Sequence, residues 1–411
     1  MGIFRKSNLL SNFLSLSIVN VAGMLLPIIA MPLLSQTLGV EGLGRILLIN
    51  TVLQFGIVCS SYSFNYVGTR DIALTKTRKE SSLIYWEVQL TKLLLLVIYS
   101  LVISLIFDCL GKVAFHILFS FLIFGLLGHW FIAIWYYQGK SKLKLPSFVM
   151  LLARVSTLLC IIMVVNDSSD YYIALYSNVL PVFFFGFFFF LFEIKSYKLS
   201  FRKIICCSKK IKKNIIKGGD VFIGDFAPNL YNNIPSLIVG VSSNPILYAS
   251  YAVATRITNA FVTFQSTLAR AIYPYLVKSE DDNVKFICLL NLATSVPVIL
   301  ILNLFSDSII FILMGESSDV GSYFLKISSI GIIFVGLANS FGQGYFLPKG
   351  KNIVFRNVSL FVSFTSSLVG IFLILYYNAF GAIMLMLFAR ALFSITYFLA
   401  YINDKRKSLS V

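Results

Sequence analysis

Five charged residues interrupt stretches of this sequence that are otherwise almost wholly apolar. Four are cations and one is an acid: Lys92, Arg154, Asp225, Arg256 and Arg390. A charge at mid-membrane costs about 2.5–3.5 kcal/mol on insertion scales, so such side chains normally face a bundle interior or a wet cavity. Four cations against one acid predict a positive interior that attracts an anion. A guanidinium group matches the geometry of a phosphate through paired hydrogen bonds.

One apolar stretch, residues 246–275, carries a polar face. At 100° per residue, five polar residues of this stretch fall within an arc of about 80°: Arg256, Asn259, Thr263, Thr267 and Arg270. We interpret this face as lining an aqueous path, with polar contacts between helices as the alternative. Snorkelling toward the membrane surface is the alternative for Lys92, Arg154 and Arg390. The predicted substrate-binding residues are Arg256, Arg390, Arg154, Lys92, Asn259, Arg270 and Arg45.

The preceding stretch, residues 217–240, carries the in-span acid. Asp225, Asn229 and Asn232 share this stretch with Pro228 and Pro235, which free backbone carbonyls and permit bending. A desolvated carboxyl group is able to carry a proton across a membrane. We therefore predict that Asp225, with both asparagines, couples transport to H⁺ or Na⁺. The alternative is that Asp225 is a fixed partner of a nearby arginine.

Other kinds of chemistry are not indicated. The only two histidines, His116 and His129, are far apart, and the six cysteines show neither a disulfide framework nor zinc spacing. The net charge of +17 comes without a phosphate-binding loop or an RNA-binding signature. We expect no catalytic residue, no metal site, no cofactor and no nucleic-acid partner.

The elements that must position these residues are membrane-spanning helices. The chain is 58% hydrophobic and only 12% charged, and a bilayer core needs about 20 apolar residues per helix. Twelve stretches meet this requirement. They are residues 9–34, 42–66, 83–107, 112–137, 146–166, 171–193, 217–240, 246–275, 284–306, 322–347, 353–377 and 379–402. The fold class is therefore an all-α membrane protein with twelve transmembrane helices.

Lys and Arg residues fall in alternate gaps between these stretches. By the positive-inside rule, both termini are predicted to be cytoplasmic. A basic loop at 194–216 divides the stretches six and six, which predicts an N-lobe (1–193) and a C-lobe (217–411) around a central cavity. Each half starts and ends inside, so the lobes are expected to be parallel repeats. Gly139-Lys140 after the fourth stretch has a counterpart in Gly350-Lys351 after the tenth.

Aromatic residues make up 15% of the chain. The run from Phe183 to Phe190 is nearly all phenylalanine, and we expect it to face lipid. Trp86, Trp130 and Trp135 are compatible with positions at the membrane interface.

Four short segments resemble a known family. Residues 38–45 (LGVEGLGR), 68–73 (GTRDIA), 135–139 (WYYQG) and 251–257 (YAVATRI) occur in order on the second, fourth and eighth stretches. They are similar to segments of O-antigen or polysaccharide-repeat-unit flippases of the Wzx type. These belong to the multidrug/oligosaccharidyl-lipid/polysaccharide exporter superfamily, so the implied fold is like that of MATE exporters and MurJ. A departure at residues 59–64 leaves the second helix without the family's Asp-Phe-Gly-like run.

The resemblance implies alternating access by two six-helix lobes. The implied substrate is an undecaprenyl-diphosphate-type lipid-linked oligosaccharide, which is moved from the cytoplasmic to the periplasmic leaflet of the bacterial inner membrane. Arg256 is the residue carried over from the family's eighth-helix segment. Membrane lipids, a polysaccharide polymerase and a chain-length regulator are the partners it suggests.

Two other functions remain open at this stage. A drug/cation antiporter of the same superfamily should show acidic residues in its cavity, whereas this chain shows cations. A membrane polysaccharide polymerase or ligase should carry a sizeable external loop, and the longest external gap between these stretches is only about fifteen residues. The sequence therefore favours a flippase, which makes and breaks no bond and is not an enzyme.

Overall fold

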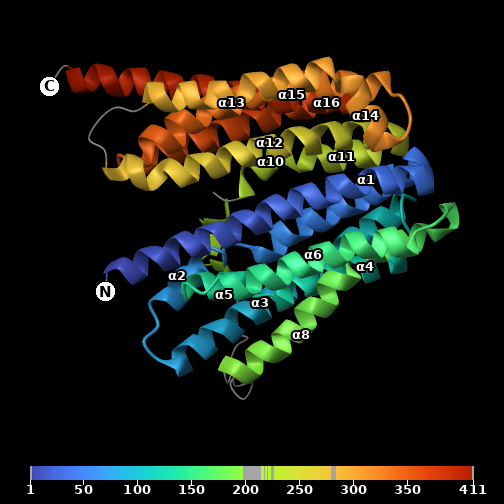
Figure 1. The fold of residues 1–411 in the computed structure, drawn as a ribbon, viewed down its shortest axis with the longest axis horizontal. Coiled ribbons are helices and arrows are strands. Elements are labelled where there is room, and N and C mark those ends of the chain that lie inside the picture. The colour runs from blue at the N-terminus through green and yellow to red at the C-terminus, as the bar shows by residue number, and fades with distance from the viewer. Residues whose placement is uncertain are drawn as a thin grey trace. The chain divides into compact units, whose positions relative to one another are not determined.

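Helices joined by turns and short loops make up the chain that the structure describes. The structure is a computed structural model, and it describes residues 2–197, 214–216, 218–219, 221–223, 226–278 and 284–409. Up to residue 197 the helices are α1 (Gly2–Ser61), α2 (Val67–Ala73), α3 (Arg78–Cys109), α4 (Phe115–Phe131), α5 (Ile134–Gly139), α6 (Lys144–Val164), the 3₁₀ turn η1 (Ser168–Asp170), α7 (Tyr171–Ser177) and α8 (Leu180–Tyr197) (Figure 1).

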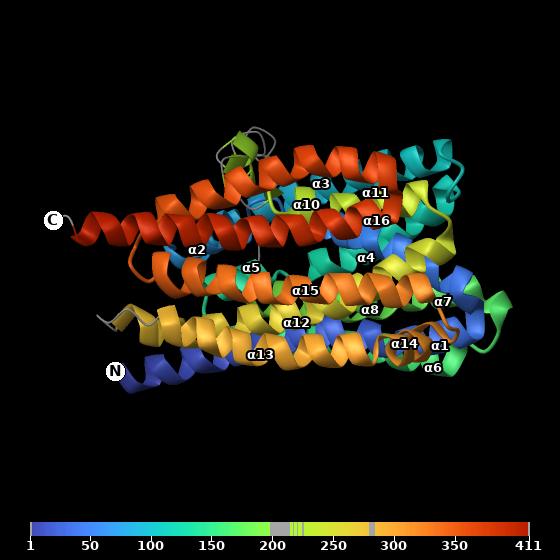
Figure 2. The same ribbon diagram turned by 90° about the horizontal axis from the view of Figure 1, so that it is seen from above.

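The second half of the chain is built in the same way. From residue 229 its elements are α10 (Asn229–Asn232), α11 (Ile234–Ser242), α12 (Pro245–Lys278), α13 (Val284–Leu304), α14 (Ser306–Met314), α15 (Asp319–Phe341), the π-helical turn η3 (Gly342–Phe346) and α16 (Asn352–Leu409) (Figure 2).

The long helices agree with a multi-span membrane protein. In the described part, eight helices are long and apolar enough to cross a membrane. Two of these helices, α1 and α16, each cover two predicted spans. Their backbones leave the helical conformation between the two spans, at Gly39 in α1 and at Asn378 in α16. The all-α membrane fold is confirmed. The count of twelve is consistent with these helices and stays a prediction.

Both breaks use a residue that tolerates the left-handed backbone region. Gly39 has φ 70° and Asn378 has φ 50°, and glycine and asparagine enter this region at the least steric cost. The hydroxyls of Ser242 and Ser243 donate to the Asn378 Oδ1 atom at 2.9 and 3.0 Å. The turn between the last two predicted spans is thus held by side-chain hydrogen bonds.

The seventh predicted span is interrupted. Where the sequence predicts a continuous helix over 217–240, the described residues form the short α10 and then α11. Pro228 lies directly before α10 and Pro235 lies in the first turn of α11. Proline lacks the N–H that would continue the hydrogen-bond ladder, so a break at each ring is expected.

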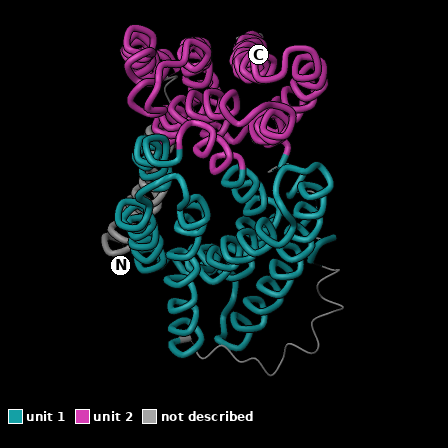
Figure 3. Tube along the Cα trace, turned by 90° about the vertical axis from the view of Figure 1, so that its right-hand side faces the viewer, with its two compact units in different colours: residues 1–38, 49–226 teal, residues 39–48, 227–411 magenta. Residues whose placement is uncertain are grey.

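The chain divides into two compact units (Figure 3). The N-terminal unit contains residues 1–38 and 49–226, and the C-terminal unit contains residues 39–48 and 227–411. Residues 39–48 therefore belong to the C-terminal unit, although the rest of that unit begins only at residue 227. A Cβ atom added to Gly44 would lie 2.0 Å from the Pro245 carbonyl oxygen, so only glycine permits this backbone approach. Most of the predicted basic loop at 194–216 lies outside the described residues.

Tryptophans fill the core of the N-terminal unit. Trp86, Trp130 and Trp135 are all buried, and Trp130 exchanges two hydrogen bonds with Gln89 of α3. The Trp130 Nε1–H donates to the Gln89 backbone carbonyl at 2.7 Å, and the Gln89 amide donates to the Trp130 carbonyl at 2.9 Å. That carbonyl lies at the break between α4 and α5, where the helical ladder is interrupted at Ile132.

The expectation that the phenylalanine run faces lipid is wrong for part of that run. Phe189 and Phe190 are buried, while Phe184 and Phe188 are at least half exposed. Helix α8 packs against both α4 and α6, and a helix between two neighbours must bury one face. An unbroken run of one apolar residue type gives no periodicity from which that face can be read.

Hydrogen bonds between helices join the core of the C-terminal unit. Helix α15 packs against α12, α13 and α16. The Asn291 amide donates to Ser340 Oγ at 2.8 Å, which links α13 to α15. The Gln265 amide donates to Ser295 Oγ at 2.6 Å, which links α12 to α13. Such bonds hold helices together where both sides of an interface are equally apolar.

Candidate functional site

The C-terminal unit holds Arg390 of α16 in its interior. This side chain is 5% exposed, and its Nη2 atom donates to Asn259 Oδ1 of α12 at 2.7 Å. Its Nη1 atom is buried and has no hydrogen-bond partner among the described residues. The guanidinium lies against Gly331 of α15, where an added Cβ atom would come within 2.9 Å of Nη1. The structure therefore brings the predicted residues Arg390 and Asn259 together.

Arg256 lies one turn before Asn259 on the same face of α12. Its Nη2 atom donates to the backbone carbonyl of Leu47 at 3.3 Å, and Leu47 belongs to the 39–48 segment of the same unit. A carbonyl is a neutral acceptor, so it orients the guanidinium without neutralising its charge. No carboxylate in the described part of the chain lies within 4.0 Å of either arginine.

Two tyrosines that the sequence reasoning missed complete this region. Tyr231 of α10 and Tyr251 of α12 are close enough to Arg390 to act on it electrostatically. The aromatic ring of Tyr231 packs against Phe393, one turn after Arg390 on α16. A tyrosine in an apolar span ordinarily serves in packing, so no sequence pattern distinguishes these two.

The N-terminal unit contains a second pair of cations, on two helices, with a histidine of a third helix near both. Lys92 of α3 and Arg154 of α6 both act electrostatically on His129 of α4. Lys92 is 7% exposed. Neither the Lys92 nor the Arg154 side chain donates a hydrogen bond to any described residue. His129 was missed as a partner because a lone histidine in an apolar helix shows no pattern.

The other predicted residues lie apart from these groups. Arg45 is 58% exposed and pairs with Glu41, four residues earlier, at 2.5 Å. Asn229 accepts a hydrogen bond from the amide of Asn233 at 2.5 Å, and Asn232 is exposed. Asp225 and the side chain of Arg270 lie outside the described residues.

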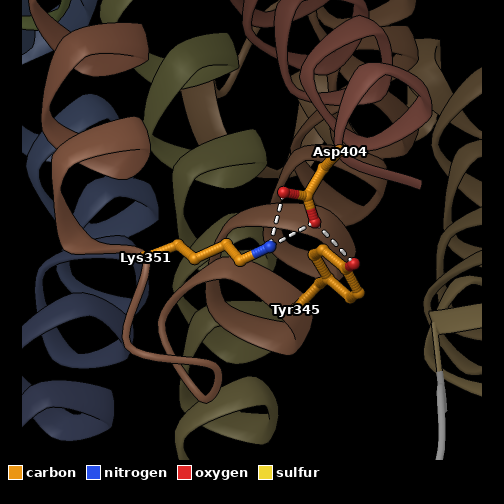
Figure 4. Close-up of polar contacts among 3 residues, drawn as sticks. All are labelled: Tyr345, Lys351 and Asp404. Atoms are coloured by element: carbon orange, nitrogen blue, oxygen red, sulfur yellow. Dashed lines mark hydrogen bonds and ion pairs between the residues drawn. The ribbon is translucent and has the colours of Figure 1, made fainter. Parts of the chain in front are cut away.

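Two acids and two lysines lie where the charge pattern places the cytoplasmic ends of the helices. In the C-terminal unit, Lys351 forms an ion pair with both oxygens of Asp404, and the Tyr345 hydroxyl donates to Asp404 Oδ2 at 2.8 Å (Figure 4). In the N-terminal unit, Tyr85 OH donates to Glu193 Oε2 at 2.9 Å. There Lys140 donates to the Tyr136 hydroxyl and lies 4.2 Å from the centre of its ring.

Metal chemistry finds no support among the described residues. They contain no group of three or more His, Cys, Asp or Glu side chains that could hold a metal ion. Cys59, Cys109, Cys160 and Cys288 are free thiols. The C-terminal unit instead holds two buried arginines, the neutral oxygens that orient them and two nearby tyrosines, and this arrangement suits an anionic group.

Taken together, the fold and these cations define a multi-span membrane transport protein. Residues 9–280 match the family described as "Polysaccharide biosynthesis protein". This match spans more than half of the chain, so the protein belongs to that family.

Sequence relatives point the same way. The chain is 26% identical over 355 residues to a protein of Escherichia coli (strain K12) named "Putative O-antigen transporter", which covers 82% of this chain and 83% of that protein. It is 21% identical over 394 residues to a protein of the same name from Shigella dysenteriae, which covers 93% and 97%.

Solved structures share the fold. The lipid II flippase MurJ in an inward closed conformation superposes with a TM-score of 0.73 at 13% identity, over 94% of this chain and 87% of that one. An inward-facing multidrug resistance transporter of the MATE family gives 0.68 at 14% identity, over 95% and 94%. The expected MATE- and MurJ-like fold is confirmed. At such identities these likenesses concern the fold alone.

Proposed function

We propose that the protein is a flippase for a lipid-linked oligosaccharide. It moves a polyprenyl-diphosphate-linked polysaccharide repeat unit from the cytoplasmic to the periplasmic leaflet of the bacterial inner membrane by alternating access. Family membership, the names of the two relatives and the multi-span fold support this proposal. Both termini are proposed to be cytoplasmic, as the placement of Lys and Arg indicates.

The observation that carries the proposal is the state of the two arginines in the C-terminal unit. Arg390 and Arg256 are held by an amide oxygen and a carbonyl oxygen, both of which are neutral. A guanidinium buried without an opposite charge is costly, and a diphosphate supplies that charge with geometry that matches paired N–H donors. Arg390 Nη1, which has no partner among the described residues, is a donor available to it.

The remaining parts of the substrate place their own demands. The sugars need a polar path, for which Asn259, Thr263 and Thr267 on one face of α12 provide hydrogen-bonding groups. The polyprenyl tail stays in lipid. Lys92 and Arg154 of the N-terminal unit are further candidate cations for a polyanionic headgroup.

Coupling to an ion gradient remains part of the proposal. Release of the diphosphate requires that binding weakens on the far side, and a proton or Na⁺ bound at Asp225 is our candidate for this step. Asn229 and Asn232 follow Asp225 in the same predicted span. The broken backbone around Pro228 makes this a region where a local change in charge is able to alter a helix.

Two alternatives have weaker support. A drug/cation antiporter needs an acid near its cationic ligand. Glu193, the buried carboxylate among the described residues, is bonded by Tyr85 and does not act on Arg256 or Arg390. A polymerase or ligase needs an external loop large enough to build a catalytic site, and the predicted external gaps are too short. Membrane lipids are implied partners. A polymerase and a chain-length regulator are proposed partners that the family resemblance suggests.

Deletion of the gene tests the function directly. We expect lipid-linked repeat units to accumulate on the cytoplasmic leaflet, and the chemical identity of their sugars would define the substrate. Complementation with Arg256→Ala should fail although the protein inserts normally. Arg256→Lys should restore part of the export, because a point charge lacks the bidentate fork.

A matched control separates the role of this site from a general effect of charge. Lys326 of α15 is a cation of the same unit that is 43% exposed and lies 3.9 Å from Asp307. Lys326→Ala should export normally. Full export by Arg256→Ala, or equal loss in both variants, would contradict the proposed site.

A further inference from the structure

The two units repeat one arrangement of a lysine and an acid. Lys140 and Lys351 are separated by 211 positions, and so are Glu193 and Asp404. Lys140 follows Gly139 at the end of α5, and Lys351 follows Gly350 in the turn after η3. Each acid lies on the last helix of its half, Glu193 on α8 and Asp404 on α16. In each unit a tyrosine ring lies beneath a lysine of this turn: Lys140 over Tyr136 at 4.2 Å, and Lys349 over Tyr345 at 4.3 Å.

The two copies differ in what holds the acid. Asp404 is partly exposed and ion-paired with Lys351. Glu193 is fully buried, and no cationic nitrogen among the described residues lies within 4.0 Å of its carboxylate. Its Oε2 atom accepts from Tyr85, and its Oε1 atom has no hydrogen-bond partner in the part of the chain that is described.

A buried carboxylate in this position has two low-cost states. It is either protonated and neutral, or ionised beside a cation, because an ionised carboxylate buried alone is strongly disfavoured. The geometry seen here suits the first state. The Lys351–Asp404 ion pair in the C-terminal unit is an example of the second state.

We propose that Glu193 is a proton-binding site that exchanges its proton for an ion pair with Lys140. When the carboxyl O–H bond breaks, the proton leaves to water, and the negative charge that remains is balanced by the Lys140 ammonium. This arrangement would place a second proton site in the flippase. The role of that site in transport rests on the proposed function, whereas the site itself is testable without any substrate.

The groups that face Glu193 are few. Tyr85 approaches from α3, Tyr137 from α5 and Lys140 from the turn after α5. Helices α4 and α6 also pack against α8, and no titratable group of theirs in the described part acts on Glu193. Burial and the neighbouring Lys142 and Arg78 lower the pKa of Lys140, and Glu193 opposes this. A lysine in such surroundings gains from meeting a carboxylate.

The tryptophans provide a direct readout. The chain has three tryptophans, and all three lie near this site. Trp86 and Trp135 pack against the Tyr85 ring with centroids 5.3 and 6.1 Å apart, and Trp130 is bonded to Gln89, one turn beyond Tyr85. Intrinsic fluorescence of the purified full-length protein in lipid nanodiscs, titrated from pH 5 to pH 10, should therefore show a single transition.

Two isosteric variants identify the group that titrates. Glu193→Gln should abolish the fluorescence transition, and Asp404→Asn, the matched change in the other unit, should preserve it. Size-exclusion chromatography and thermal unfolding confirm that both variants are folded. A transition in Glu193→Gln with the wild-type midpoint and amplitude would overturn the proposal.

A third variant retains the acid and tests its exchange partner. Lys140→Gln should keep the transition and move its midpoint to higher pH, because loss of the cation makes the ionised carboxyl less stable. An unchanged midpoint would exclude Lys140 as that partner. Failure of Arg256→Ala to affect export would contradict the proposed function and leave these titrations unaffected, so the two failures are distinguishable.

Discussion

Buried cations are held differently in the two units. In the C-terminal unit, Arg256 and Arg390 each donate to a fixed neutral oxygen, so their guanidinium groups are oriented before any ligand arrives. In the N-terminal unit, the Lys92 and Arg154 side chains make no hydrogen bond to a described residue. If the proposed function is correct, we expect the C-terminal unit to recognise the shape of the anion and the N-terminal unit mainly to contribute positive charge.

The largest expected effect comes from removing an oriented guanidinium. Arg390→Ala should lower export about 10- to 100-fold, since a hydrogen bond to a charged group contributes about 1.5–3 kcal/mol. Transport of a radiolabelled lipid-linked repeat unit in proteoliposomes measures this loss. Arg154→Ala should cost less in the same assay. An equal loss in both variants would remove the distinction between the units.

Exchange of arginine for lysine sharpens the comparison. Lysine keeps the charge and loses the planar fork. Arg390→Lys should therefore lower transport about 10-fold, whereas Arg154→Lys should change it by less than about 3-fold. If Arg154→Lys lowers transport more than Arg390→Lys does, Arg154 is the residue that recognises the shape of the anion.

A smaller effect is expected at the proposed ion-coupling residue. Asp225→Asn should slow turnover a few-fold and weaken its dependence on an imposed H⁺ or Na⁺ gradient, with little loss of substrate affinity. Transport with and without each gradient measures both quantities. Full gradient dependence in this variant would make Asp225 a structural partner of a neighbouring arginine.

The smallest effect concerns the tyrosines that bond the two acids. Tyr85→Phe should destabilise the protein more than Tyr345→Phe, because Glu193 loses its hydrogen-bond donor while Asp404 keeps Lys351. Leaving a buried acceptor unsatisfied costs about 1–3 kcal/mol, against about 1 kcal/mol for an ordinary hydrogen bond. Thermal unfolding in matched nanodiscs compares the two variants. A larger loss of thermal stability in Tyr345→Phe than in Tyr85→Phe would contradict this prediction.

Much of the fold follows from composition, because length and apolarity alone decide what crosses a membrane. The break at Asn378 was predicted between the last two spans, since only one residue separates two apolar stretches there. The interruption between α10 and α11 was anticipated only as bending at Pro228 and Pro235. Packing of α8 against α4 and α6 decides which phenylalanines of the run are buried. A run of one residue type has no periodicity from which this packing could be predicted.

The candidate site was harder to predict than the fold. Charge in an apolar span identified Arg256 and Arg390, because burying a cation is costly enough to require a reason. The bond between Arg390 and Asn259 joins residues 131 positions apart, and no local pattern encodes it. Glu193 was overlooked because it stands at the end of a predicted span, where an acid ordinarily reaches water.

Residues 39–48 also have a consequence for biosynthesis. This segment is synthesised early, yet the backbone that it packs against at Gly44 includes Pro245. At about 5–20 residues per second, roughly 200 further residues take on the order of 10–40 s to appear. During that interval the segment is inserted without its final neighbour, and the apolar surface that it will later bury faces lipid or the insertion machinery. One of the earliest parts of the chain is thus needed to complete the C-terminal unit. A bulky residue in place of Gly44 would therefore block folding at the late step in which this segment packs against Pro245.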